Sequence, residues 1–360
     1  MEKKTNDILL TPVKLGALNL KNRMIMAPLT RCRADERTRA PNDLMVKYYK
    51  QRSSAGLIIT EATSVCPMGV GYPQTPGIWS EEQVKGWQKV TDAVHQEGGK
   101  IILQLWHVGR ISASLYLNGK LPLAPSAVKP AGHPSLVRPI RDFETPKAMS
   151  IDEIQETIKA FEQGAKNAKK AGFDGVEIHG ANGYLLDQFL QDSTNLREDE
   201  YGGTLEKRAR FMLEVTDAVC GVWGADRVGM HLAPRCDAHD MGDSNPVETF
   251  SYIAKELGRR KLAFLFARAN LGSDDLTQKL KKAFGGAYVI NQQLSKSEAE
   301  SAIESGIADA ASWGQLFIAN PDLVSRFEQN EKRNVPDSTT FYLGGQEGYI
   351  DYPFLSSKAS

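Results

Sequence analysis

The sequence predicts an α/β protein built as a single (β/α)8 TIM barrel, with an insertion after its third strand. Eight apolar runs of strand length recur along the 360 residues, and helical stretches separate them. Most of these runs are continuously hydrophobic rather than alternating, as expected of parallel strands that are covered on both faces. Eight strands, each followed by a helix, is the number that closes such a barrel.

The strands are predicted at 24–27, 57–61, 100–105, 176–179, 228–232, 262–266, 287–290 and 308–312. One helix begins at the capping box that Ser150 forms with Glu153, and Gly172 ends it. Further helices are predicted near 43–54, 81–97, 205–223, 246–258, 275–284, 295–305 and 321–330. A doubly wound sheet is the alternative fold, but no glycine fingerprint of the dinucleotide-binding type opens the first strand–helix unit.

The segment 109–149 is rich in Pro, Ser and Gly and is too long for a plain connection between a strand and a helix. We expect it to be a lid inserted after the third strand. No repeat of solenoid period interrupts the pattern, so residues 1–360 are expected to form one domain.

Composition excludes several classes of partner. The 44 basic and 44 acidic residues cancel, so nothing indicates binding to nucleic acid or to an anionic membrane. No run approaches the ~18 apolar residues of a membrane span. The four cysteines form no CxxC pair and are expected to be free thiols. We therefore expect a cytoplasmic protein that acts on small molecules as a monomer or homodimer.

Residues that follow the strands of a barrel converge on one face, where catalysis normally occurs. The candidates there are Thr30 and Arg31, Glu61 and Thr63, Gln104, Trp106 and His107, His179, Asn182 and Tyr184, and His231 and Arg235. Any one of them could have a purely structural role, such as a satisfied core histidine or a tryptophan that closes the barrel top. Together, these hydroxyl, amide, aromatic and imidazole groups suit a flat, amide-bearing ring better than a metal ion.

The segment 175–184 is the most informative. A short apolar strand ends in a glycine-rich turn that carries His179 and Asn182, and Tyr184 follows. Reduction of a conjugated carbonyl builds negative charge on its oxygen, which preplaced donors stabilise. The α-carbon then needs a weak acid, and a phenol remains protonated at neutral pH.

Ordered motifs along most of the chain, from about Leu10 to Leu355, point to one family. They are LKNR at 20–23, MAPLTR at 26–31, AGLI at 55–58, PGI at 76–78, QLWHVGR at 104–110, HGANGYLLDQFL at 179–190, YGG at 201–203, FIANPDL at 317–323 and GYIDYP at 348–353. The sequence resembles the Old Yellow Enzyme family of FMN-dependent ene-reductases, including proteins similar to bacterial N-ethylmaleimide reductases and plant 12-oxophytodienoate reductases.

The resemblance implies roles for individual residues. FMN would be held by Ala27, Pro28, Leu29, Thr30, Ala62, Gln104, His231, Gln293, Gly314 and Gln315. His179 and Asn182 would hold the substrate oxygen, and Tyr184 would protonate the α-carbon after flavin N5 delivers hydride to the β-carbon. Tyr72 and Trp106 would shape the substrate side, and Tyr349 would close the pocket. NADPH or NADH would be the electron donor.

Three positions depart from the family pattern. His231 stands where an arginine is usual, with Arg235 as a candidate replacement; Gln292 and Gln293 follow the seventh strand; Gln315 replaces an arginine after the eighth. An arginine–phosphate contact contributes ~1.5–3 kcal/mol, which corresponds to about 10- to 150-fold in affinity. We therefore expect FMN to bind more weakly than in typical relatives.

The leading hypothesis is NAD(P)H-driven reduction of activated alkenes, and also of nitro compounds and quinones. The alternative is a flavin-poor, catalytically impaired paralogue that serves as a binding or regulatory barrel. A non-redox aldolase would need a lysine at a strand end, and none is evident. The loop 236–243 contains Cys, His and Asp, but nothing elsewhere completes a metal site, so a solvated acidic loop is expected.

Overall fold

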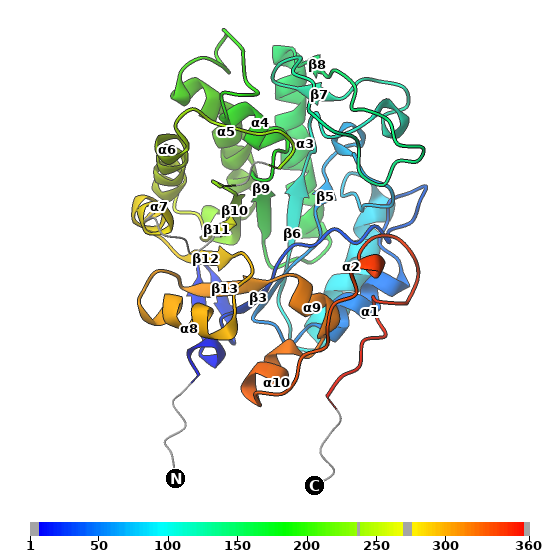
Figure 1. Ribbon diagram of the computed structural model, residues 1–360, viewed down its shortest axis with the longest axis vertical. Coiled ribbons are helices and arrows are strands. Elements are labelled where there is room, and N and C mark those ends of the chain that lie inside the picture. Colours follow the sequence, from blue (N-terminus) through cyan, green and yellow to red (C-terminus); the bar gives the residue numbers. More distant parts are fainter. Residues whose placement is uncertain (1–6, 236–237, 269–275, 356–360) are drawn as a thin grey trace.

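The chain folds into a closed barrel of eight parallel strands. Figure 1 shows this computed structural model, which describes residues 7–235, 238–268 and 276–355. The strands are β3 (Met24–Met26), β4 (Leu57–Ile59), β6 (Ile101–Trp106), β9 (Val176–His179), β10 (Val228–Leu232), β11 (Phe264–Arg268), β12 (Tyr288–Asn291) and β13 (Ala310–Trp313). They pair in the order β4-β3-β13-β12-β11-β10-β9-β6, and a β4–β6 pairing closes the ring. The predicted (β/α)8 fold is confirmed.

Helices follow the strands and surround the barrel (Figure 1). They are α1 (Asp43–Gln51), α2 (Glu81–Gln96), α3 (Ile151–Lys170), α4 (Leu185–Leu190), α5 (Leu205–Trp223), α6 (Pro246–Arg259), α7 (Leu276–Phe284), α8 (Lys296–Glu304), α9 (Gln315–Ala319) and α10 (Leu323–Glu328). The capping box at Ser150 is present. Two short helices, α4 and α9, are absent from the sequence prediction, and β11 ends two residues later than predicted. No helix of the described residues combines the length and apolarity needed to cross a bilayer.

The inside of the barrel holds its own apolar cluster, which includes Ile25, Ile102 and Phe264. A hairpin of β1 (Val13–Leu15) and β2 (Leu18–Leu20) adds its leucines to this cluster. Its turn requires glycine, because Gly16 has a φ of +57° and a Cβ there would lie 2.2 Å from the carbonyl oxygen of Asp226. Asp226 lies in the 3-10 turn Ala225–Arg227 that leads into β10, so the hairpin closes the end of the barrel where the strands begin.

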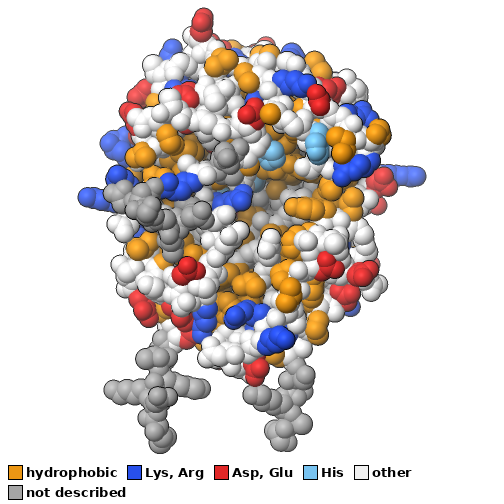
Figure 2. Space-filling model, in the orientation of Figure 1, with side chains coloured by type: hydrophobic (Ala, Val, Ile, Leu, Met, Phe, Trp, Pro, Cys, Tyr) orange, Lys and Arg blue, Asp and Glu red, His pale blue; other side chains and the backbone are white. Residues whose placement is uncertain are grey.

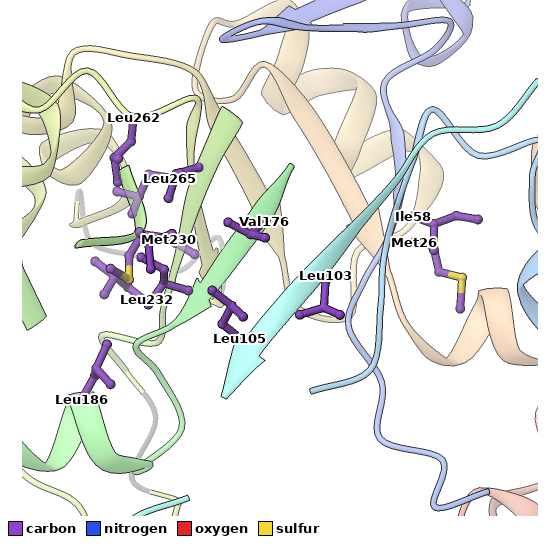
Figure 3. Packing of buried hydrophobic residues seen from close by; sticks show 14 of the residues in the cluster. Met26, Ile58, Leu103, Leu105, Val176, Leu186, Met230, Leu232, Leu262 and Leu265 are labelled. Atoms are coloured by element: carbon purple, nitrogen blue, oxygen red, sulfur yellow. The ribbon is translucent and has the colours of Figure 1, made fainter. Parts of the chain in front are cut away.

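A second cluster packs the outside of the strands against the helices. Figure 3 shows part of it, with Leu103, Leu105 and Val176 on neighbouring strands and Met230 close by. On β3, β4, β11 and β12, residues alternate between the two clusters, as the period of two requires. These strands are thus apolar on both faces, whereas β9 and β10 place Glu177, His179 and His231 at the alternate positions.

Short elements sit above the carboxyl ends of the strands. β5 (Thr63–Ser64) extends the sheet beside β6, and within the predicted insertion β7 (Leu123–Ala124) pairs with β8 (Lys147–Ala148). Arg110 anchors the insertion, because its Nη1 donates to the carbonyl of Val128 at 3.0 Å. β7 and β8 lie at the top of the molecule in Figure 1, near α3.

Candidate active site

Strand register brings the predicted polar residues together inside the carboxyl end of the barrel. Gln104 on β6 is the register partner of Glu177 on β9, and His179 on β9 is the partner of His231 on β10. On β11, Arg268 follows the inward-facing Phe264 and Phe266 at the same period of two. The barrel mouth is therefore lined by groups from several strands.

Two adjoining cavities occupy this mouth. The inner one, of about 100 Å³, is lined by Pro28, Thr30, Ala62, Gln104, Trp106, His179, Asn182, Tyr184 and His231. The outer one, of about 410 Å³, shares Pro28, Thr30 and Tyr184 with it. Its other lining residues are Leu29, Tyr72, Ser135, Leu136, His239, Gln315, Ile318, Phe341 and Tyr342. Figure 2 shows a hollow near the centre of the molecular face, with hydrophobic side chains and histidines around it.

His179 is a neutral hydrogen-bond donor. Burial lowers the pKa of its imidazole to about 3, with a further contribution from nearby His239. The backbone N–H of Ala181 donates to Nδ1 at 3.3 Å. Because Nδ1 accepts, the proton of the neutral ring lies on Nε2, and His179 lines the inner cavity with that donor.

Asn182 is a second donor whose orientation is fixed by an arginine. It adopts a φ of +57°, which asparagine tolerates better than most residues. Arg268 Nη1 lies 3.2 Å from Asn182 Oδ1 and can only donate, so the amide oxygen faces Arg268. The Nδ2 group of Asn182 is thereby left to donate elsewhere. The same guanidinium donates through Nε to Gln292 Oε1 at 2.7 Å.

Tyr184 sits in an aromatic setting between the two cavities. Its ring packs edge-on against Trp106 and His179, each at a centroid distance of 5.0 Å. Its hydroxyl lies 3.0 Å from that of Tyr72, whose ring stacks on Trp106. These contacts hold the phenol beside the two donors.

Gln104 and His231 form a donor–acceptor pair that fits the edge of a flat heterocycle. Gln104 Nε2 donates to Glu177 Oε2 at 2.7 Å and to His231 Nδ1 at 3.3 Å, which leaves Gln104 Oε1 as an acceptor. Burial, with smaller effects of His179 and Arg268, holds the pKa of His231 well below its usual value, so the ring is neutral. Its Nε2–H is buried without a partner among the described residues. An acceptor on a bound flavin ring would satisfy it.

The loops predicted to bind the FMN phosphate carry no arginine. After β12, Gln292 and Gln293 adopt φ values of +126° and +48°, a region that favours glycine. After β13, Gln315 is exposed and lines the outer cavity. At Gly314 a Cβ would lie 2.9 Å from Leu29 Cδ2, so a side chain there would crowd the strand-1 loop. Amide groups and backbone therefore surround this end of the site.

Two sequence predictions are not supported by position. Tyr349 does not line either cavity: it is fully buried, stacks on Tyr48 at 4.2 Å, and lies under the guanidinium of Arg31. The tail residues that line the outer cavity are instead Phe341 and Tyr342. Arg235, expected to replace the missing arginine, is exposed and lines neither cavity. Arg268 is the arginine whose charge acts on His231.

Sequence reasoning missed Arg268 and His239. The predicted strand ended at Phe266, although continued alternation would have placed Arg268 inside the barrel. His239 belongs to the loop expected to be solvated, yet it lines the outer cavity. Of that loop, Cys236 and Asp237 lie outside the described residues. Within the described ranges no cluster of three His, Cys, Asp or Glu side chains is placed to hold a metal ion.

Comparison with known proteins agrees with this geometry. Residues 8–334 match the model of the NADH:flavin oxidoreductase / NADH oxidase family. A protein of Oryza sativa subsp. japonica named putative 12-oxophytodienoate reductase 5 is 42% identical, over 96% of this chain and 95% of its own. A probable flavin mononucleotide-dependent alkene reductase of Leishmania infantum is also 42% identical, over 98% and 99%.

Solved structures show the same arrangement of the whole chain. Morphinone reductase in complex with tetrahydroNAD superposes with a TM-score of 0.94 at 44% identity, covering 98% of this chain and 99% of that one. An old yellow enzyme homologue from Zymomonas mobilis gives a TM-score of 0.93 at 42% identity, covering 96% and 99%.

Proposed function

We propose that this chain, which belongs to the NADH:flavin oxidoreductase / NADH oxidase family, reduces the C=C bond of α,β-unsaturated carbonyl compounds. Membership of the family makes it an FMN-dependent oxidoreductase driven by a reduced nicotinamide. The family predicted from the sequence motifs is confirmed. Relatives named as alkene and 12-oxophytodienoate reductases support an ene-reductase. Nitro compounds and quinones are proposed as further substrates, since their oxygens need the same two donors.

The observation that carries the proposal is the arrangement of three groups around one cavity. The Nε2–H of His179 and the Nδ2–H of Asn182 are the donors, and the hydroxyl of Tyr184 is the acid. FMN, when bound and reduced, supplies the hydride that adds to the β-carbon. His179 and Asn182 hold the substrate oxygen and stabilise the negative charge that builds on it. Tyr184 gives its proton to the α-carbon.

The remaining predicted residues divide between the two faces of the site. We propose that the ring of FMN lies against Ala27, Pro28, Leu29, Thr30 and Ala62, with Gln104 and His231 at its polar edge. Trp106 and Tyr72 would border the substrate. Gln293, Gly314 and Gln315 would face the phosphate. All of these except Ala27, Gln293 and Gly314 line one of the two cavities.

We also propose that the insertion 109–149 acts as a lid. Ser135 and Leu136 line the outer cavity from above, so the insertion forms part of its wall. A lid over this cavity would exclude water while the charged transition state forms.

A spectroscopic experiment tests the function. Purified protein is titrated with FMN, reduced anaerobically with NADPH or NADH, and then mixed with cyclohexenone. Bound flavin should bleach on reduction and recover its absorbance when the enone is added. Tyr184→Phe should slow the second step and leave the first unchanged. A protein that takes up no FMN would contradict the proposal, and a Tyr184→Phe variant that loses the first step would contradict the role of Tyr184.

A further inference from the structure

We propose that the proton lost by Tyr184 is replaced through a side-chain relay that runs from solvent to His239, from His239 to Tyr72, and from Tyr72 to Tyr184. The relay rests on the proposed function, in which Tyr184 is the acid. The hydroxyl of Tyr72 lies 3.0 Å from that of Tyr184 and 3.5 Å from His239 Nε2. All three side chains line the outer cavity.

The tautomer of His239 is set by its second contact. His239 Nδ1 lies 2.7 Å from the carbonyl oxygen of Asn182. A carbonyl can only accept, so Nδ1 carries a proton in both charge states of the ring. The nitrogen that gains and loses a proton is therefore Nε2, the atom that faces Tyr72.

The side chain of Arg110 holds the loop that carries His239 in place. Arg110 is buried, and its Nη2 donates to the carbonyl oxygens of His239 at 3.0 Å and of Asp240 at 2.9 Å. Both loop residues have positive φ values, 62° and 60°, which side-chain-bearing residues rarely adopt. An arginine that binds two consecutive carbonyls fixes this conformation and keeps the imidazole pointing at Tyr72. His239 remains partly exposed, so its ring can exchange protons with water.

The proton transfers balance. When Tyr184 protonates the α-carbon, its O–H bond breaks and a C–H bond forms. Tyr72 then gives its hydroxyl proton to the phenolate, and the protonated ring of His239 gives the Nε2 proton to Tyr72. His239 takes a new proton from solvent. No group in the relay changes oxidation state, because both electrons of the C–H bond at the β-carbon come from the reduced cofactor.

The surroundings of His239 set the pH range of the relay. Among the described residues, the titratable and charged groups around it are Arg110, Tyr72, Tyr184, His179 and its neighbour Asp240. Burial, and secondarily the charge of Arg110, lower the pKa of His239 from its usual value of 6.5, while the contact with the Asn182 carbonyl raises it. Protonated His239 is the form that can donate from Nε2. The relay is thus fully available below this pKa and is lost as pH rises through it.

Two variants separate the relay from a structural role. His239→Gln keeps a polar group at the position but cannot gain and lose a proton, and Tyr72→Phe removes the middle of the relay. His133→Gln, in the exposed part of the insertion, is the matched control. Steady-state reduction of cyclohexenone by the FMN-loaded protein is measured in mixtures of H2O and D2O. Wild type and the control should give a curved dependence on the deuterium fraction, since several protons move; both test variants should give a straight line. Below the pKa of His239 that the NMR titration gives, they should also turn over ~3- to 10-fold more slowly, a small part of the effect of a full general acid.

A measurement without FMN or substrate tests the Tyr72–His239 contact directly. The histidine ring signals of the FMN-free protein are followed by NMR between pH 4 and 8, and His239→Gln identifies the signal of His239. Tyr72→Phe should raise the pKa of His239, because the phenol no longer donates to the neutral ring. An unchanged pKa, or a straight-line deuterium dependence in wild type, would overturn the relay. If wild type reduces no enone, the proposed function fails instead, and the NMR titration still decides whether the contact exists.

Discussion

Restoring one positive charge to the phosphate loops should tighten the binding of FMN but not of riboflavin. The change is Gln315→Arg, at the first residue of α9 on the wall of the outer cavity. Riboflavin shares the ring of FMN and lacks its phosphate. A gain confined to FMN therefore reports a new arginine–phosphate contact, and a gain for both ligands would report a change at the ring.

The expected size follows from the exposure of the side chain. A hydrogen bond to a charged group contributes ~1.5–3 kcal/mol, but an exposed ion pair contributes only ~0.2–1 kcal/mol. Gln315 is exposed, so an arginine there would lie between these cases, at about 1–1.5 kcal/mol. That corresponds to about 5- to 10-fold in affinity, since each ~1.4 kcal/mol is a factor of ten. Salt should reduce the gain, because exposed charges are screened.

The assay is quenching of flavin fluorescence during titration of FMN-free protein, at low and at physiological salt. Gln329→Arg, an exposed position at the end of α10, is the control for net charge. The reasoning is refuted if Gln315→Arg and Gln329→Arg change FMN affinity equally, or if riboflavin affinity rises with that of FMN. Wild-type affinity as tight as in the arginine variant would show that amides and backbone already satisfy the phosphate.

Two further changes test the barrel mouth. Arg268→Met should reduce turnover of cyclohexenone about tenfold (~1.4 kcal/mol), because the Asn182 amide is released but not removed. An unchanged turnover would contradict this positioning role, and so would a loss near the ~10²–10³-fold caused by deleting an oxyanion donor. Glu177→Gln should flatten the pH dependence of stability, measured by urea unfolding. Burial raises the pKa of Glu177 from 4.5 to about 8, so the folded wild type keeps a proton that the unfolded chain loses. The stability of the wild type therefore falls as pH rises from 4.5 toward 8. Equal slopes for variant and wild type between pH 5 and 8 would mean that Glu177 ionises alike in both states.

The barrel could be predicted because its strands are hydrophobic on both faces. A parallel strand covered inside and out needs no partner information to be recognised, and a capping box such as that of Ser150 and Glu153 fixes a helix start locally. The same reliance on hydrophobic runs ends the predicted strand at Phe266, two residues before β11 ends. Arg268 breaks the hydrophobic run, although the mouth of a barrel is wet enough to accept a charge that pairs with Asn182 and Gln292.

The three residues that we propose as donors, His179, Asn182 and Tyr184, could be grouped from the sequence because they lie within six residues of one another on one turn. The other contacts depend on segments far apart in the chain, which no local pattern encodes. His239 reaches Tyr72 across 167 residues, and Tyr349 is withdrawn from the cavity by its stacking on Tyr48, about 300 residues away. The direction in which such side chains turn is decided by tertiary packing, not by their own neighbours.

The arrangement of charge suggests how this chain differs from its family. Positive charge is missing where the resemblance places it against FMN, at His231 and Gln315, and His231 is held neutral by burial. An arginine of the barrel mouth, Arg268, instead binds the amide of Asn182, which we propose as a donor to the substrate oxygen. A cation behind Asn182 polarises that donor and stabilises negative charge on the substrate, whereas a neutral His231 stabilises an anionic reduced flavin less. Both effects favour electron transfer from cofactor to alkene, so we expect the chain to give up its electrons readily and to hold its cofactor loosely.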